Sequence, residues 1–84
     1  MISARALKAA RVAARLQQQE LAKLGHISVP TLKNMETSNQ AVESCRSIAL
    51  HNVLKSIEQC GVKIEEAHFP DGKRKYTISW EEVV

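Results

Sequence analysis

The sequence predicts a mainly α-helical domain of about four helices, followed by a C-terminal two-stranded β-hairpin. Apolar residues recur at helical spacing over positions 4–60 and then alternate with polar ones. Pro-Asp-Gly-Lys at 70–73 is typical of the turn between two strands. A length of 84 residues, 44% of them hydrophobic, suffices for one small globular domain. We therefore predict a helical unit at 1–61 and a hairpin with its tail at 62–84.

Each predicted helix has apolar residues on one face. Ser3 precedes the first helix, expected at about 4–15, and Gly61 follows the last, expected at about 47–60. Two short helices are expected between them, at about 18–25 and 29–36. Segment 37–46 has mixed composition, so we expect a loop that holds no more than about one helical turn. The residues expected to face inward are Leu7, Ala10, Ala14, Leu21, Leu24, Leu32, Met35, Leu50, Val53, Leu54 and Ile57.

Alternation in the hairpin places five apolar side chains on one face. A lone two-stranded hairpin is only marginally stable in water, and both of its strands are open edges. We therefore expect this face, together with one edge, to form the interface of a homodimer. The residues expected there are Val62, Ile64, Tyr76, Ile78 and Trp80.

Charge is distributed unevenly along the chain. Residues 1–35 carry six basic side chains and one acidic one, whereas residues 36–84 carry six basic and eight acidic ones. A basic N-terminal half suits a polyanion such as nucleic acid, although a solvated surface explains the charge equally well.

The cysteines and histidines do not form a pattern typical of a metal site or a nucleophilic enzyme. Cys45, His51, Cys60 and His68 contain no compact pair of ligands, and a chain this short leaves little room for a catalytic pocket. We therefore expect no metal, no cofactor and no enzymatic activity. Cys60 is expected to pack in the core or at a helix end.

Two features bear on where the protein acts. The two cysteines are expected to be unpaired, which suits a reducing cytoplasm, and no apolar run reaches the ~20 residues of a membrane span. The arginine-rich start at 1–15 is also compatible with a transit peptide. It runs into the next predicted helix without a linker, so we expect it to belong to the fold of a cytoplasmic protein.

Residues 18–36 have the pattern of a helix-turn-helix. Such a motif needs a small residue where its two helices touch, apolar residues facing the core, and a cap for the second helix. Ala22 is the small residue, and Ser28 stands at the cap position. The apolar positions are Leu21, Ile27, Leu32 and Met35.

The stretch from Arg11 to Glu36 resembles the Cro/cI-like, or Xre-type, family of helix-turn-helix transcriptional regulators. The matching pattern is R-x-x-x-x-L-x-Q-x-E-L-A-x-x-x-x-I-S-x-x-T-L-x-x-x-E. The resemblance covers residues 4–36 well and 47–61 loosely, whereas the loop at 37–46 and the hairpin lie outside it. It implies a lambda-repressor-like helical domain that binds double-stranded DNA.

The resemblance also implies roles for single residues. Gln18 would contact a phosphate and brace a base-reading side chain, and Ser28 would cap the recognition helix and could also meet a phosphate. Arg11 and Glu36 would form a structural pair. The positions facing the major groove would be Val29, Pro30, Lys33 and Asn34. Apart from the resemblance, the positive charges of Lys8 and Arg15 lead us to expect these side chains near DNA phosphates.

Unusual backbone geometry is expected at two turns and at the start of the helix predicted at 29–36. Arg15 and His26 stand where the family usually has glycine, so we expect strained or adjusted turns there, with Gly25 absorbing some of the strain. With Ser28 as cap, Pro30 is the second helical residue, where the missing N–H has no intrahelical partner. Val29 and Pro30 cannot donate to base edges, so polar readout is expected from Lys33 and Asn34.

The leading hypothesis is a sequence-specific repressor of bacterial or phage type that binds a palindromic operator as a homodimer. The alternative is an antitoxin-type module that binds a partner toxin and regulates its own operon. A further choice concerns the hairpin, which could instead fold back as a wing and place Lys73, Arg74 and Lys75 on DNA.

Overall fold

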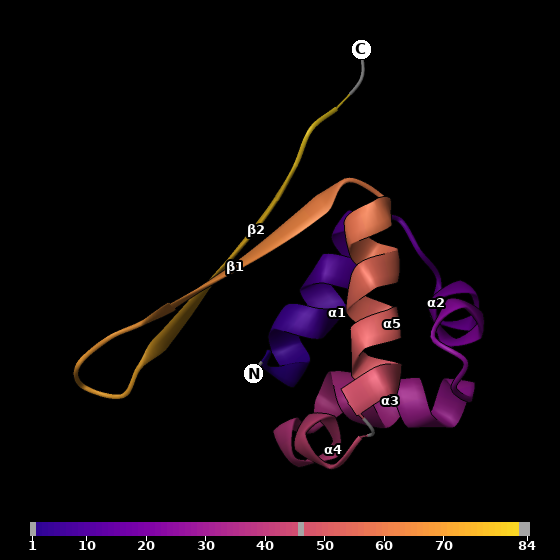
Figure 1. Cartoon of the computed structure of the whole chain (residues 1–84), viewed down its shortest axis with the longest axis horizontal. Coiled ribbons are helices and arrows are strands. Elements are labelled where there is room, and N and C mark those ends of the chain that lie inside the picture. The colour runs from indigo at the N-terminus through magenta and orange to yellow at the C-terminus, as the bar shows by residue number, and fades with distance from the viewer. Residues whose placement is uncertain (1, 46, 83–84) are drawn as a thin grey trace.

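A computed structural model describes residues 2–45 and 47–82 of the chain. In those residues a helical body is followed by a two-stranded antiparallel hairpin, as the sequence predicted (Figure 1). The body holds five helices where about four were expected. The elements are α1 (Ala4–Ala13), α2 (Gln18–Leu24), α3 (Val29–Thr37), α4 (Asn39–Ser44), α5 (Ser47–Gln59), β1 (Val62–His68) and β2 (Arg74–Trp80).

The first helix begins where the sequence predicted. The Ser3 side chain accepts a hydrogen bond from the backbone N–H of Ala6 at 3.1 Å, which satisfies one of the N–H groups that a helix start leaves without a partner. The predicted end at about 15 was two residues too long, because Arg15 adopts φ +57° and cannot continue a right-handed helix.

The segment expected to be a loop contains α4. The Ser38 side chain accepts from the backbone N–H of Ala41 at 3.3 Å and starts this helix. Val42 is its one buried residue, so no apolar period was visible in the sequence. Asn39 Oδ1 accepts from the backbone N–H of Ala4 at 2.8 Å and joins α4 to the start of α1.

The helices enclose one apolar core. Val53 and Ile57 of α5 are fully buried, as predicted, whereas Leu24 at the end of α2 is 49% exposed. The prediction that Leu24 faces inward was therefore wrong. The buried apolar residues are Ala4, Ala6, Leu7, Ala10, Leu21, Ala22, Leu32, Met35, Val42, Val53, Ile57 and Val62.

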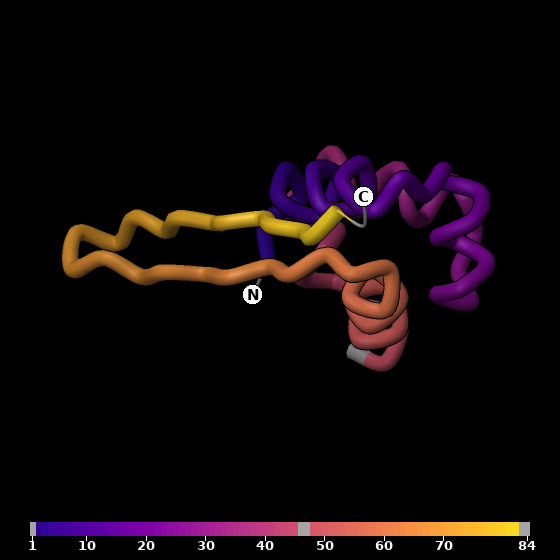
Figure 2. Tube along the Cα trace, turned by 90° about the horizontal axis from the view of Figure 1, so that it is seen from above, coloured from indigo at the N-terminus to yellow at the C-terminus, as the bar shows by residue number. Residues whose placement is uncertain are grey.

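The hairpin begins directly after α5, where Gly61 has φ +85°. Val62 pairs with Trp80, Ile64 with Ile78 and Glu66 with Tyr76, so the five predicted apolar residues do share one face. Gly72, with φ +87°, lies in the tight turn, across which Phe69 N–H donates to the Lys73 carbonyl at 2.9 Å. The far end of the hairpin projects beyond the helices (Figure 2).

None of the described helices is long and apolar enough to cross a bilayer.

Candidate nucleic-acid interface

The motif predicted at 18–36 forms α2, a short turn and α3. Leu21 and Ala22 of α2, and Leu32 and Met35 of α3, are buried where the two helices meet the core. The Ser28 side chain accepts from the backbone N–H of Thr31 at 3.2 Å and caps α3, as predicted. The cap at Ser28 therefore sets where α3 begins, and shared packing on the core holds it beside α2.

The start of α3 tolerates its proline. Val29 is the first helical residue and Pro30 the second, so the missing proline N–H removes no intrahelical bond. The predicted register at the helix start is thus confirmed.

A polar stripe runs along the outer side of α3. Pro30, Lys33 and Asn34 are exposed, whereas Val29 is half-buried. Thr37 continues the stripe at the C-terminal end, and its hydroxyl donates to the carbonyl of Lys33 at 3.0 Å. The sequence analysis did not single out Thr37, although its helical spacing from Pro30 and Lys33 was visible.

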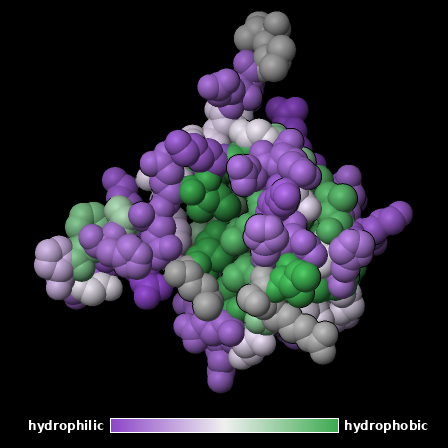
Figure 3. All heavy atoms as spheres, in the orientation of Figure 1, coloured by the Kyte–Doolittle hydropathy of each residue, from purple (hydrophilic) through white to green (hydrophobic). Residues whose placement is uncertain are grey.

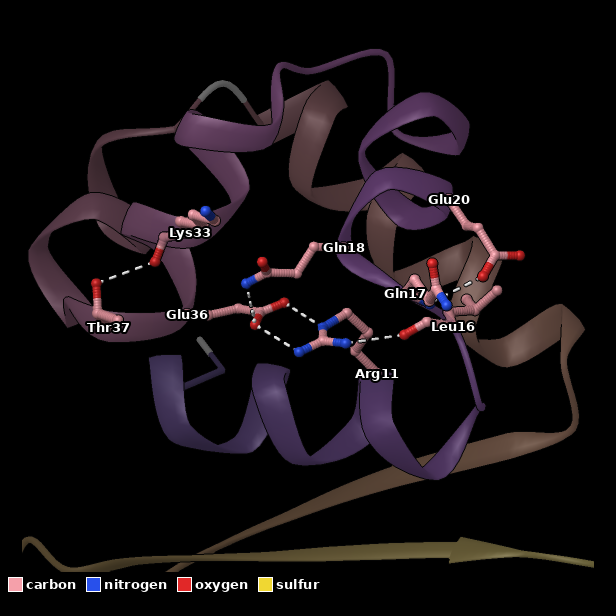
Figure 4. A network of polar contacts seen from close by, with 8 residues as sticks. All are labelled: Arg11, Leu16, Gln17, Gln18, Glu20, Lys33, Glu36 and Thr37. Atoms are coloured by element: carbon pink, nitrogen blue, oxygen red, sulfur yellow. Dashed lines mark hydrogen bonds and ion pairs between the residues drawn. The ribbon is translucent and has the colours of Figure 1, made fainter.

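A buried polar network holds α3 against α1 and α2 (Figure 4). Arg11 Nε donates to Glu36 Oε2 at 2.6 Å and Arg11 Nη2 donates to Glu36 Oε1 at 3.1 Å. Arg11 Nη1 donates to the Leu16 carbonyl at 2.8 Å. Gln18 Nε2 donates to Glu36 Oε1 at 3.2 Å, so the side chain expected to brace a base-reading residue contacts the structural pair instead.

Burial makes this network important for the position of α3. The side chain of Glu36 is 1% exposed and that of Arg11 is 12% exposed. A carboxylate withdrawn from water needs compensating charge and hydrogen bonds, and three N–H donors supply them here. In the described residues, no buried side-chain nitrogen or oxygen lacks a hydrogen-bond partner.

Both turns around α2 contain a residue in the left-handed region. Arg15 and His26 each have φ +57°, so the turns predicted to be strained at these two positions are confirmed. Gly25 does not absorb the strain, because its own φ is −83°. A Cβ at position 25 would instead lie 2.5 Å from Val53 Cγ2, so this glycine permits α2 to approach α5.

The structure does not connect the two predicted α1-side cations with α3. Lys8 lines a groove with Val12 and Trp80, and Arg15 lies 4.0 Å from Glu82. In the described residues, neither Lys8 nor Arg15 forms a hydrogen bond or ion pair with α3. Both lie near the C-terminal end of the hairpin, and α1 lies between the strands and the Gln18–Glu36 network in Figure 4.

The predicted interface residues of the hairpin differ in exposure. Val62 is 2% exposed and belongs to the core of its own chain, so its side chain is not available to a second copy. The expectation that Val62 contributes to a dimer interface is therefore wrong. Ile64, Tyr76 and Ile78 are half-buried and Trp80 is 51% exposed.

The cysteines lie in different environments. Cys60 directly follows α5 and is exposed, so it lies at the helix end, which is one of the two predicted places, and not in the core. Cys45 is partly buried, and this burial raises the pKa of its thiol, an effect partly offset by a backbone hydrogen bond with Leu50. Over residues 2–45 and 47–82, no three His, Cys, Asp or Glu side chains gather closely enough to hold a metal ion.

No protein-family model matches this sequence, and no characterised protein matches it closely enough to identify a relative.

Proposed function

We propose that this protein is a sequence-specific DNA-binding transcriptional regulator of repressor type, using residues 18–36 as its helix-turn-helix. The observation that carries the proposal is the buried network of Arg11, Glu36 and Gln18, which fixes α3 with a polar stripe facing solvent. Such a rigid, exposed helix is what insertion into a major groove requires. The resemblance of the stretch from Arg11 to Glu36 to Cro/cI-like regulators supports the same function.

The chemistry of α3 defines what it would read. Asn34 can form a bidentate pair with adenine, and Lys33 can reach guanine or a phosphate. Pro30 and Val29 offer apolar contact to a thymine methyl group. With so few polar readers, part of the sequence preference would come from DNA shape and from phosphate contacts.

Phosphate contacts would come from residues beside α3. Ser28 lies at the capped start of α3, where backbone N–H groups also point outward. Gln18 Nε2 donates one hydrogen bond to Glu36, and the second hydrogen on the same nitrogen would donate to a phosphate. Lys8 and Arg15 would make weaker, peripheral contributions, because both lie toward the hairpin.

A homodimer on a palindromic operator fits this role. Two copies related by a two-fold axis can place two α3 helices about 34 Å apart, in successive major grooves of one DNA face. A repressor of this kind acts by occupying its operator.

DNA selected from a random pool provides the test. The purified protein should enrich a palindromic sequence, and affinity for that duplex should fall steeply as salt concentration rises. Gln18→Ala should weaken binding to many sequences, whereas Gln19→Ala, a matched change at the exposed neighbouring position, should not. A folded protein that binds no duplex at low salt would overturn the proposal.

The projecting hairpin favours one alternative, an antitoxin-type protein that binds a partner toxin. Trp80 and Phe69 are 51% and 48% exposed on this hairpin and could contact another protein. The adjacent reading frame discriminates between the two functions, because an antitoxin gene lies beside its toxin gene. Co-expression of that neighbour should then yield a complex that survives purification.

A further inference from the structure

The hairpin has two open edges with different chemistry. The sheet contains only β1 and β2 within the described residues, so each strand has an outer side. The bond from Phe69 N–H to the Lys73 carbonyl fixes the alternation of the ladder. It follows that Ile78 and Trp80 direct their backbone groups outward from β2, whereas Thr77 directs its groups toward Glu65 of β1.

The edge of β1 is poorly suited to pair with a second β1. Lys63, Glu65 and Glu66 are all exposed along it. An antiparallel pair that uses the whole strand would be centred on Glu65 and would place two carboxylates directly opposite each other. Like charges in that position are destabilising, and exposed charges are a common protection of strand edges.

The edge of β2 is suited to self-pairing. Full overlap of Arg74–Trp80 with a second copy centres the two-fold axis on Thr77, which would face its own counterpart. Tyr76 would then lie beside Ile78 of the other copy, and Lys73 opposite Glu81. Threonine pairs, aromatic pairs with β-branched residues, and pairs of opposite charge are all favourable across strands.

Apolar surface accompanies this edge. β2 lies on the side of α1, and β1 on the side of α5 (Figure 2). Between α1 and β2 lies a groove lined by Ala9, Val12, Ala13, Ile78 and Trp80, with Arg5 and Lys8 also contributing. Val12 is 58% exposed and Trp80 51% exposed, so the groove offers apolar surface to solvent.

A second groove lies along β1, on the face shown in Figure 3, where apolar surface meets charged residues. Its lining residues are Ile2, Leu54, Val62, Ile64 and Tyr76, together with Glu58, Lys63 and Glu66. The β1 edge beside it would place Glu65 opposite Glu65 of a second copy. This groove is therefore the less favourable surface for self-association.

We propose that the outer edge of β2, with the groove between α1 and β2, binds a second copy of this chain through antiparallel β2–β2 pairing. The inference rests on the proposed function for its biological use, because it supplies the two-fold axis that a palindromic operator needs. It is testable without DNA. The interface would contain Tyr76, Ile78 and Trp80. Val62 and Ile64 remain with the core of their own chain, against which part of Ile78 also packs.

Cross-linking tests the assignment of the edge. In the full chain with Cys45→Ser and Cys60→Ser, Thr77→Cys should form a covalent dimer on mild oxidation without DNA. Directly opposite residues at a non-hydrogen-bonded position lie about 4.5 Å apart, which is within disulfide range. Glu65→Cys, on the opposite strand of the same hairpin, should remain uncross-linked at the same concentration.

A second pair of variants tests the same edge by charge. Thr77→Lys places a lysine beside Glu65 within the chain but opposite a second lysine across the proposed interface. It should weaken dimerisation about fivefold at low salt, as measured by sedimentation, and less at high salt. Glu65→Thr changes the net charge equally on β1 and should leave the dimer intact.

The outcomes separate this inference from the proposed function. A dimer that cross-links through Glu65→Cys rather than Thr77→Cys, or a parent chain that sediments as a monomer at tens of micromolar, would overturn the β2 interface. Either result leaves DNA binding by α3 to be judged by the duplex titration. Conversely, a Thr77→Cys dimer that binds no DNA would support the interface and contradict the proposed function.

Discussion

Glu36 at the end of α3 accepts two hydrogen bonds from the guanidinium of Arg11 in α1, at 2.6 and 3.1 Å. The two residues are 25 positions apart in the sequence, and their side chains are nearly excluded from water. This pair therefore couples the position of the candidate recognition helix to the first helix of the chain.

Glu36→Gln should lower the free energy of unfolding by about 3 kcal/mol. The substitution keeps the shape of the side chain but leaves the buried Arg11 charge without its carboxylate. Urea denaturation of the parent and the variant, followed by circular dichroism, measures the difference.

Glu82→Gln is the matched control for this loss. Glu82 lies 4.0 Å from Arg15, and both side chains are well exposed, at 66% and 88%. An exposed pair contributes little, so this variant should stay within about 0.5 kcal/mol of the parent. Equal unfolding midpoints for Glu36→Gln and the parent would show that the buried pair does not stabilise the fold.

The sequence predicted those parts of the fold in which a helix cap and an apolar period agree. Ser3 and Ser28 start α1 and α3, and the alternation of apolar residues located the hairpin. α4 was expected only as about one helical turn within a loop, because Val42 alone is buried in its six residues and a single residue defines no period.

Residues far apart in sequence limited the prediction of the candidate site. The Arg11–Glu36 pair was expected only through the family resemblance, since no local rule joins residues in different helices. The role of Gly25 depends on Val53 approaching from α5, which local sequence does not specify. Leu24 was assigned inward by spacing, but α2 ends at that residue and leaves it at the surface.

Gly25→Ala should destabilise the protein by about 1–3 kcal/mol through overpacking. A Cβ there would lie 2.5 Å from Val53 Cγ2, although the backbone φ of −83° suits alanine. Adding Val53→Ala should recover part of this loss, so that the double variant is more stable than the two single losses predict. Thermal melts of the four proteins give this coupling.

Gly72→Ala provides a contrast to Gly25→Ala. Position 72 has φ +87°, and a Cβ placed there would have no atom beyond its chain neighbours within 4 Å, so the cost there is conformational. Val53→Ala should not reduce it. If Val53→Ala rescued both glycine variants equally, the close approach of α2 to α5 would not explain the requirement for Gly25.

His26→Gly should stabilise the protein by about 1 kcal/mol. His26 is exposed and has φ +57°, which costs a residue with a Cβ more than it costs glycine. His26→Val should have the opposite effect, because β-branched residues avoid this region most strongly. Guanidinium unfolding of the three proteins measures both changes, and a less stable His26→Gly would contradict the strain at this turn.

Alkylation of the native protein by iodoacetamide at pH 7.5 should modify Cys60 faster than Cys45. Burial limits access to Cys45 and raises the pKa of its thiol, so that less thiolate is present below that pKa. Raising the pH should therefore increase the rate at Cys45. Peptide mapping by mass spectrometry measures both rates. The two rates should become equal in the unfolded protein, and equal rates in the native protein would contradict the burial of Cys45.

Asn34→Ala should relax the base preference of the protein at one position of each operator half-site. Asn34 is exposed on the outer stripe of α3, and an asparagine that pairs with adenine contributes ~1–3 kcal/mol of discrimination.

Lys33→Ala should instead reduce affinity. If Lys33 meets a phosphate, the slope of log affinity against log salt concentration should also become shallower by about one. Lys55→Ala, at an exposed position of α5, is the control for loss of charge and should change neither property. Titrations against the selected operator and its single-base variants at three salt concentrations distinguish these effects. If Asn34→Ala keeps the affinity and the base preference of the parent, then Asn34 does not read a base, and the groove-facing side of α3 must be assigned anew.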